Sequence, residues 1–197
     1  VAIWLLLAAN TREQAQGRLL DDLRISAAIL EMNMPNWTFT WTEAGELDTV
    51  AARSMPKFRN HDMIDMVGRV SGDTATLFAF DPETQDYVRK TTTIIDNDGN
   101  RIVETPLAKD GPAYPVVLAG GTYQGEANIL GTPYYAIYKP ILDNAGGPLG
   151  LIYVGVAKSE IDASAAESIV VLGLVGAVAI LAIGALAVFA ASRLTRP

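Results

Sequence analysis

The sequence predicts an α+β domain, in which one long helix precedes an antiparallel sheet of five strands, followed by a transmembrane helix. Apolar residues recur every three or four positions up to residue 34, which is typical of a helix with one buried side. From residue 74, short runs of β-branched and aromatic residues alternate with Gly-rich turns, which is typical of strands. From Ser168 to Ser192 the chain has no charged residue.

The first helix is expected to have two parts. Residues 1–10, "VAIWLLLAAN", are apolar but too few to span a membrane, so we interpret them as the end of a truncated first transmembrane helix; the apolar region of a signal peptide is the alternative. Residues 11–34 continue it outside the membrane until Pro35 and Asn36 end it. Its apolar positions are Leu19, Leu20, Leu23, Ala27, Leu30 and Met34.

Residues 35–160 are predicted to form the folded domain. "NWTFTWTEAGE" is predicted to be a loop or a strand, and "DTVAARSMPKFRNHDMIDMVGRV" one or two short helices broken at Pro56. Five strands in meander-like order are then expected: "TATLFAFD", "DYVRKTTTII", "TYQGEANILG", "PYYAIYKPIL" and "PLGLIYVGVAK". "DNDGNR" between them predicts a tight turn with Gly99 at positive φ, and "GPAYPVVLAGG" a short helix.

The apolar C-terminal segment sets the expected orientation. Residues 161–167 would connect the domain to a transmembrane helix at 168–192, which at about 1.5 Å per residue is longer than the ~30 Å hydrocarbon core. Arg193 and Arg196 follow this helix, so the positive-inside rule places the C-terminus in the cytoplasm and residues 11–167 outside. The outer segment holds 13 Lys and Arg against 22 Asp and Glu, which argues against nucleic acid as a partner.

Residues that would indicate catalysis or cofactors are scarce. The chain has no cysteine and one histidine, His61, and it lacks the glycine-rich motifs that bind nucleotides. "DNDG" (residues 96–99) lacks the further ligands of a calcium loop and is better explained as a hairpin turn. We therefore expect no enzymatic activity, no cofactor and no metal.

Two groups of polar residues on the predicted strands are candidates for ligand binding. Arg89 could meet a ligand carboxylate or an acidic residue of the fold, whereas Lys90 is expected in solvent. Strand alternation puts Tyr134 and Tyr138 on one face and Tyr135 and Lys139 on the other. It also separates Arg89 from Thr92, unless a bulge re-aims part of the strand.

Four segments together resemble single Cache sensor domains: "MIDMVGRVSGDTATLFAFD", "DYVRKTTTIIDNDGNRIVETPLA", "YPVVLAGGTYQGEANILGTPYYAIYKPILD" and "GLIYVGVAK". The closest type is the Cache 3/Cache 2 fusion domain of bacterial methyl-accepting chemotaxis proteins. The resemblance covers roughly residues 35–160, and residues 193–197 resemble the start of a HAMP linker. The chain departs from the family pattern at Thr92-Thr93, where Thr-Asn is common, and at Glu104-Thr105, where Gly-Thr is common.

The resemblance implies a PAS-like fold in the periplasm, anchored in the bacterial inner membrane. It implies a homodimer formed through the long helix and a cytoplasmic signalling module beyond residue 197. It also implies that a small ligand, with a carboxylate favoured, binds between the sheet and its covering loops. The implied ligand-binding residues are Arg89, Thr92, Tyr123, Ala127, Tyr135, Tyr138 and Lys139.

We therefore expect the sensory region of a transmembrane chemoreceptor. Two alternatives stay open from the sequence: the input domain of a sensor histidine kinase or cyclase, and a ligand-free dimerisation scaffold that senses a partner protein.

Overall fold

A computed structural model of the chain describes the backbone of residues 2–163 and the side chains of residues 12–163. The chain divides into two compact units, Val1–Lys158 and Ser159–Pro197, and the described part of the second unit, residues 159–163, is helical. The predicted transmembrane helix, the HAMP start and residues 164–167 of the connector lie outside the described residues. Within the described part of the chain, no helix is long and apolar enough to cross a membrane.

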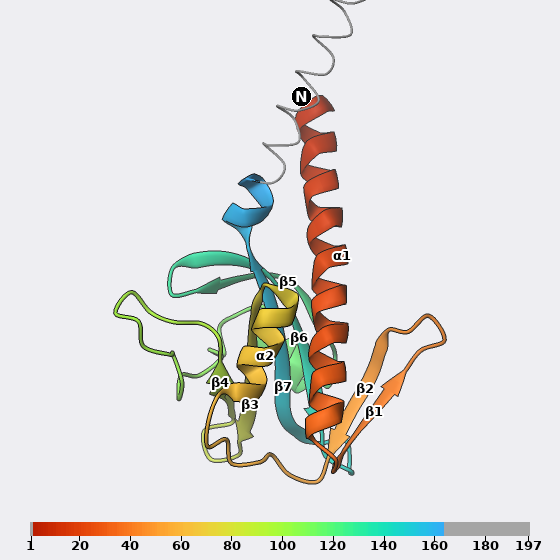
Figure 1. Ribbon diagram of the computed structural model, residues 1–197, viewed down its shortest axis with the longest axis vertical. Helices are drawn as coiled ribbons and strands as arrows, with labels where there is room; N and C mark the ends of the chain where they lie inside the picture. The colour runs from red at the N-terminus through yellow and green to blue at the C-terminus, as the bar shows by residue number, and fades with distance from the viewer. Residues whose placement is uncertain (1, 164–197) are drawn as a thin grey trace, which may run out of the picture. The chain divides into compact units, whose positions relative to one another are not determined.

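The long first helix is confirmed as α1 (Ala2–Asn33), which ends two residues before Pro35. Its buried apolar side chains recur at the predicted spacing, on the side that packs against β6, β7 and the helix α2 (Figure 1). They are Ala15, Leu19, Leu23, Ala27 and Leu30.

The five predicted strands are all present in the central sheet. They are β3 (Thr74–Asp81), β4 (Asp86–Thr92), β5 (Tyr123–Ile129), β6 (Thr132–Leu142) and β7 (Pro148–Ala157). Their spatial order is β5-β6-β7-β3-β4, with every neighbouring pair antiparallel. The order is not a simple meander, because the last strand inserts between the β5–β6 hairpin and the β3–β4 hairpin.

The prediction of five antiparallel strands was incomplete, because the sheet has seven strands and is mixed. The aromatic segment forms β1 (Trp37–Trp41), which pairs with β2 (Leu47–Ala52), and β2 meets β6 in a parallel bridge at Ala51 and Leu142. The prediction of a helix starting at "DTVAA" was wrong because Val50 pairs with Phe39 across the hairpin and both are buried.

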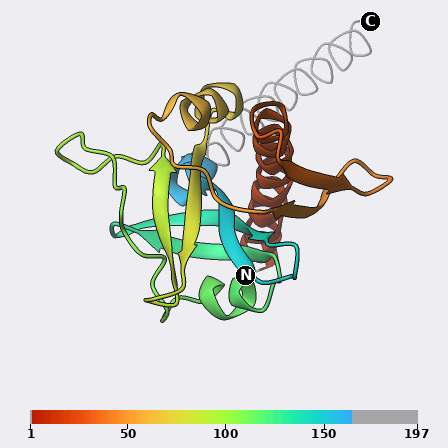
Figure 2. The same ribbon diagram turned by 90° about the horizontal axis from the view of Figure 1, so that it is seen from below.

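Helices cover both faces of the central sheet (Figure 2). The second predicted helix is confirmed as α2 (Asp62–Ser71), which ends at Gly72 with φ +82° and lies beside α1. On the opposite face is the short predicted helix α3 (Ala113–Leu118), which packs on β5 and β6. The predicted turn before it has Gly99 at φ +83°, and the amide of Asp96 donates to the carbonyl of Asn100.

Candidate functional site

A β-bulge in β4 brings Arg89 and Thr92 to the same face of the sheet. Leu77 of β3 is paired with Thr91, but the next residue, Phe78, is paired with Arg89, so Lys90 is the extra residue of the bulge. Without this residue, positions 89 and 92 would point to opposite faces. We call the resulting surface, which also carries Tyr138 and Tyr153, the Arg89 face.

Arg89 is a buried cation with few partners. Its side chain is 6% exposed, and its guanidinium carbon lies 4.9 Å from the centre of the Phe78 ring. Nη1 donates to the hydroxyl of Thr105 at 2.5 Å and to the carbonyl of Ile102 at 3.4 Å, while the buried Nε has no hydrogen-bond partner. Burial, which disfavours the charged form, lowers the pKa of Arg89.

No carboxylate among the described residues lies within ion-pair distance of Arg89. Of the two partners that the sequence left open for it, the acidic residue of the fold is therefore absent from the described part of the chain. The neighbouring Lys90 is instead paired with Glu104 at 2.7 Å at the surface.

A row of hydroxyl groups crosses the Arg89 face from strand to strand. Tyr123, Tyr138, Tyr153, Thr76 and Thr92 occupy directly opposed positions on β5, β6, β7, β3 and β4. The rings of Tyr138 and Tyr153 are 4.9 Å apart, and the hydroxyls of Thr76 and Thr92 are 2.6 Å apart.

The phenols of this row stay protonated at neutral pH. Burial raises the pKa of Tyr138 to about 12 and that of Tyr153 well above its usual value. Tyr138 can therefore donate a hydrogen bond to an anion next to Arg89, whereas the hydroxyl of Tyr153 lies 3.3 Å from that of Thr74.

The Arg89 face is closed by the connection between β4 and β5, residues 93–122, which we call the cover segment. Its apolar residues pack onto Phe78, Tyr138 and Tyr153 to form one buried cluster. They are Ile94, Ile102, Ala113 and Val117.

The cover segment is tied to α2 by an ion pair. Arg101 forms two bonds with Asp65, at 2.7 and 2.9 Å, and also donates to the carbonyl of Thr92. Glu104 has φ +57°, a conformation that favours glycine, which is the residue the family pattern has at this position.

The scan against family models matches residues 56–168 to single Cache domain 3, more than half of the chain. The chain belongs to the single Cache domain 3 family. The α+β architecture with its N-terminal helix and mixed sheet is accordingly a Cache, PAS-like sensor fold.

Solved structures similar to this Cache domain include two sensory domains and one periplasmic domain. The E. coli DcuS sensor domain has 12% identity and a TM-score of 0.40, over 52% of this chain and 68% of that one. The periplasmic domain of RsbU from Chlamydia trachomatis has 9% identity and a TM-score of 0.43, over 81% of this chain and 55% of that one. The periplasmic sensory domain of the Campylobacter jejuni chemoreceptor Tlp1 has 15% identity and a TM-score of 0.40, over 79% of this chain and 58% of that one.

The chain thus spans little more than half the length of the RsbU and Tlp1 structures. No curated protein matches it.

The Cache sheet divides the seven predicted ligand-binding residues between its two faces. The Arg89 face carries Arg89, Thr92, Tyr123, Ala127 and Tyr138. Tyr135 and Lys139 alternate with Tyr138 along β6 and point to the other face, so they do not join this group. Burial lowers the pKa of Lys139, and its charge faces Asp48.

Sequence reasoning missed three residues of the Arg89 face, Thr76, Phe78 and Tyr153, and Thr105 of the cover segment, which binds Arg89. One local signal could have found Tyr153, because Tyr-Xaa-Gly occurs in β5 and again in β7. In both strands the ring lies over the glycine two residues later, where a Cβ on Gly125 would be 2.5 Å from the Tyr123 hydroxyl and one on Gly155 would overlap that of Tyr153. Thr105 carried no such signal, since it approaches Arg89 only through the fold.

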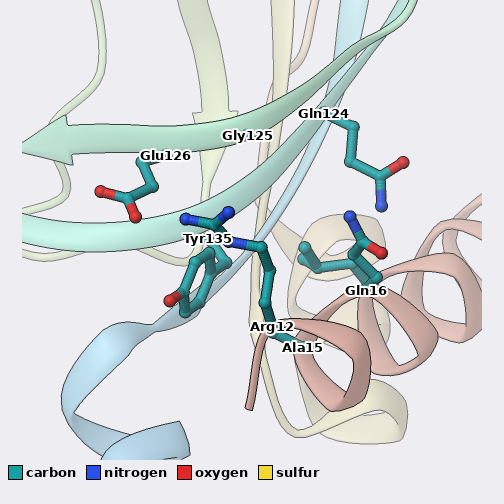
Figure 3. Close-up of a pocket in the computed structure, with 8 residues that line it drawn as sticks. Arg12, Ala15, Gln16, Gln124, Gly125, Glu126 and Tyr135 are labelled. Atoms are coloured by element: carbon teal, nitrogen blue, oxygen red, sulfur yellow. The ribbon is translucent and has the colours of Figure 1, made fainter. Parts of the chain in front are cut away.

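A cavity of about 340 Å³ lies on the other face of the sheet, between α1 and the β5–β6 hairpin (Figure 3). Arg12, Gln16, Gln124 and Tyr135 point toward it. Beside it, Lys158 donates to Glu126 at 2.8 Å, and its ammonium lies 5.0 Å from the centre of the Tyr135 ring. Tyr135 thus lies with Lys158 and Glu126 on the other face of the sheet and not on the Arg89 face.

Proposed function

We propose that this Cache domain is the extracytoplasmic sensory region of a transmembrane chemoreceptor, and that it binds a small carboxylate next to Arg89. The observation that carries the proposal is the buried guanidinium whose Nε has no partner and which pairs with no carboxylate among residues 12–163. Family membership supports a sensory role.

The energetics of burial favour an anionic ligand. A buried charge is unfavourable unless it is paired. Removing a cation from water without a counter-ion costs on the order of several kcal/mol. A ligand carboxylate could accept one hydrogen bond from Nε of Arg89 and one from the phenol of Tyr138. Two charge-assisted bonds of about 1.5–3 kcal/mol each sum to about 3–6 kcal/mol, which corresponds to affinities from millimolar to tens of micromolar.

The ligand is expected to be small, because the Arg89 face is already filled by aromatic rings and by the cover segment. Binding therefore requires the cover segment to move away from the sheet and close again over the ligand. A ligand shifts this equilibrium only by its difference in affinity for the two arrangements.

The strand order supplies a route for the signal. Tyr153 belongs to β7, the central strand, which leads directly into the helical residues 158–163. We propose that a change at the Arg89 face shifts β7, and that the C-terminal apolar segment carries this shift across the bacterial inner membrane to a cytoplasmic module.

Isothermal titration calorimetry with a series of C2 to C6 mono- and dicarboxylates, on the whole chain in nanodiscs, tests the carboxylate site. Amines and neutral amino-acid amides serve as the comparison set. Arg89→Met keeps the apolar volume and removes the charge, and it is expected to abolish binding of the carboxylate that the wild type binds. Lys90→Met, one residue away at the surface, is the matched control and is expected to bind like the wild type.

If Arg89→Met binds the same carboxylate with unchanged affinity, the site is elsewhere. If the wild type binds members of the amine set and no carboxylate, the ligand class is wrong.

A further inference from the structure

A pair of buried carboxyl groups joins α1 to the corner between α2 and β3, residues 72–74. Asp22 of α1 is 3% exposed, and Asp73 of the corner is 8% exposed. Two like charges buried side by side repel each other, and each also loses its hydration. Neither carboxyl belongs to the Arg89 face, although Asp73 directly precedes β3, which carries Thr76 of that face.

One member of this pair, Asp73, forms an ion pair with Arg18 of α1. Arg18 donates through Nε and Nη2 to the two carboxylate oxygens of Asp73, at 2.5 and 2.7 Å. Oδ2 of Asp22 is buried and has no hydrogen-bond partner. The charged groups that face Asp22 are Arg18 and Asp21 on α1 and Asp73 on the corner.

The chemistry of the two carboxyls requires a proton between them. Two ionised carboxylates have only acceptors, so they cannot hydrogen-bond to each other, whereas a protonated one donates an O–H to the other. Burial is the largest cause that raises the pKa of Asp22, to about 8, and the neighbouring carboxyl of Asp73 also raises it. Because Arg18 binds both oxygens of Asp73 and Oδ2 of Asp22 has no partner, Asp22 is the carboxyl that carries the proton.

We propose that Asp22 is a proton-binding site through which the domain responds to the pH outside the cell. With the proton bound, Asp22 donates to Asp73, and α1 is held against the α2–β3 corner. When the proton leaves, two anions share a single guanidinium and the attachment of α1 at this point weakens. This response does not depend on the Arg89 site, so the domain would integrate two independent stimuli.

The test compares the wild type with two variants of the whole chain in nanodiscs. Asp22→Asn keeps the shape and fixes the uncharged state. Asp21→Asn is the matched control, because Asp21 is the adjacent residue of α1 but its side chain is exposed and paired with Arg24 at the surface.

Two quantities are measured between about pH 5 and pH 9: the carbon-13 shift of the Asp22 carboxyl by NMR, and the hydrogen-exchange protection of α1 residues near Asp22, corrected for the intrinsic pH dependence of exchange. In the wild type we expect the carboxyl to titrate near neutral or higher pH. As the pH rises toward that midpoint, the equilibrium constant for opening of this part of α1 is expected to increase by up to about tenfold per pH unit. Asp22→Asn is expected to lose this dependence, and Asp21→Asn to retain it.

The proposal is overturned if the Asp22 carboxyl titrates near pH 4 like an exposed aspartate, or if α1 protection in the wild type and Asp22→Asn has the same pH dependence. The NMR titration uses the wild type alone, so it decides the matter even if Asp22→Asn does not fold.

Discussion

At the scale of single residues, Arg89 shows a conflict between stability and binding. Its charge is buried, and its two hydrogen bonds go to neutral oxygens of the cover segment. An apolar side chain of similar length at this position would make the ligand-free domain more stable, because a buried charge without a counter-ion is destabilising. The residue that costs the free domain stability is the one that a carboxylate would need.

This conflict gives the first prediction. Arg89→Met is expected to leave the free energy of unfolding of the ligand-free domain unchanged or to increase it by about 1 kcal/mol. Urea unfolding followed by fluorescence measures it, with Lys90→Met as the surface control. A loss of more than about 2 kcal/mol would instead make Arg89 a structural residue that acts through Thr105 and Ile102.

The tyrosine rings of the Arg89 face depend on two glycines. A Cβ at Gly155 would overlap the hydroxyl of Tyr153. Because Tyr153 is fully buried, its ring has no space to move away. Gly155→Ala is expected to lower the free energy of unfolding by about 1–3 kcal/mol through overpacking. The double variant with Tyr153→Phe removes the hydroxyl and should recover part of this loss, and no recovery would refute the steric explanation.

At the scale of elements, the cover segment is held at its two ends by different contacts. Arg101 binds Asp65 on α2 and the carbonyl of Thr92, whereas α3 packs onto β5 and β6. The side chains of the ion pair are about one third exposed, at 30% and 29%, so the pair is worth less than a fully buried one.

Arg101→Ala is therefore expected to lower global stability by only about 1 kcal/mol but to increase hydrogen exchange in residues 94–105 markedly more than elsewhere. Exchange followed by mass spectrometry measures this difference. Lys90→Ala breaks another ion pair of the same segment, to Glu104, but at the surface, and it is expected to change exchange much less. Equal effects of both variants would contradict the assignment of Arg101 as the main tie.

The sequence allowed the elements to be predicted better than the contacts between them. The period of apolar residues in α1 and the turn at Gly99 are local, and both predictions were confirmed. The prediction of a helix at β2 was wrong because the conformation of this segment depends on its pairing with β1. The position of Arg89 relative to Thr92 depended on one extra residue at Lys90, and no composition or spacing in β4 marks a bulge.

At the scale of the whole molecule, the buried phenols set the alkaline limit of stability. Burial raises the pKa of Tyr87 and of Tyr138 to about 12, and that of Tyr153 further above its ordinary value. A raised pKa in the folded state means that the stabilisation is complete below pH 10, the value in the unfolded chain, and is lost as the pH rises from 10 toward 12.

Spectroscopic titration of the tyrosines at 295 nm checks this prediction. We expect one group of tyrosines to ionise near pH 10 and a second group only above it, together with unfolding. The charge of Arg89 lowers the pKa of Tyr138, so in Arg89→Met the ionisation of Tyr138 should move to higher pH. A single transition near pH 10 in the folded protein would contradict the burial of these phenols.

The central position of β7 also has a consequence for how the domain is made. Among the described strands, the β3–β4 hairpin and the β5–β6 hairpin do not pair with each other, and β7, which follows both in the sequence, joins them. During synthesis both hairpins must wait with one open edge until residues 148–157 have left the ribosome, because a domain folds as a unit. Unpaired edges bind other strands readily, so the nascent domain is most exposed to aggregation and to proteases just before its final strand arrives.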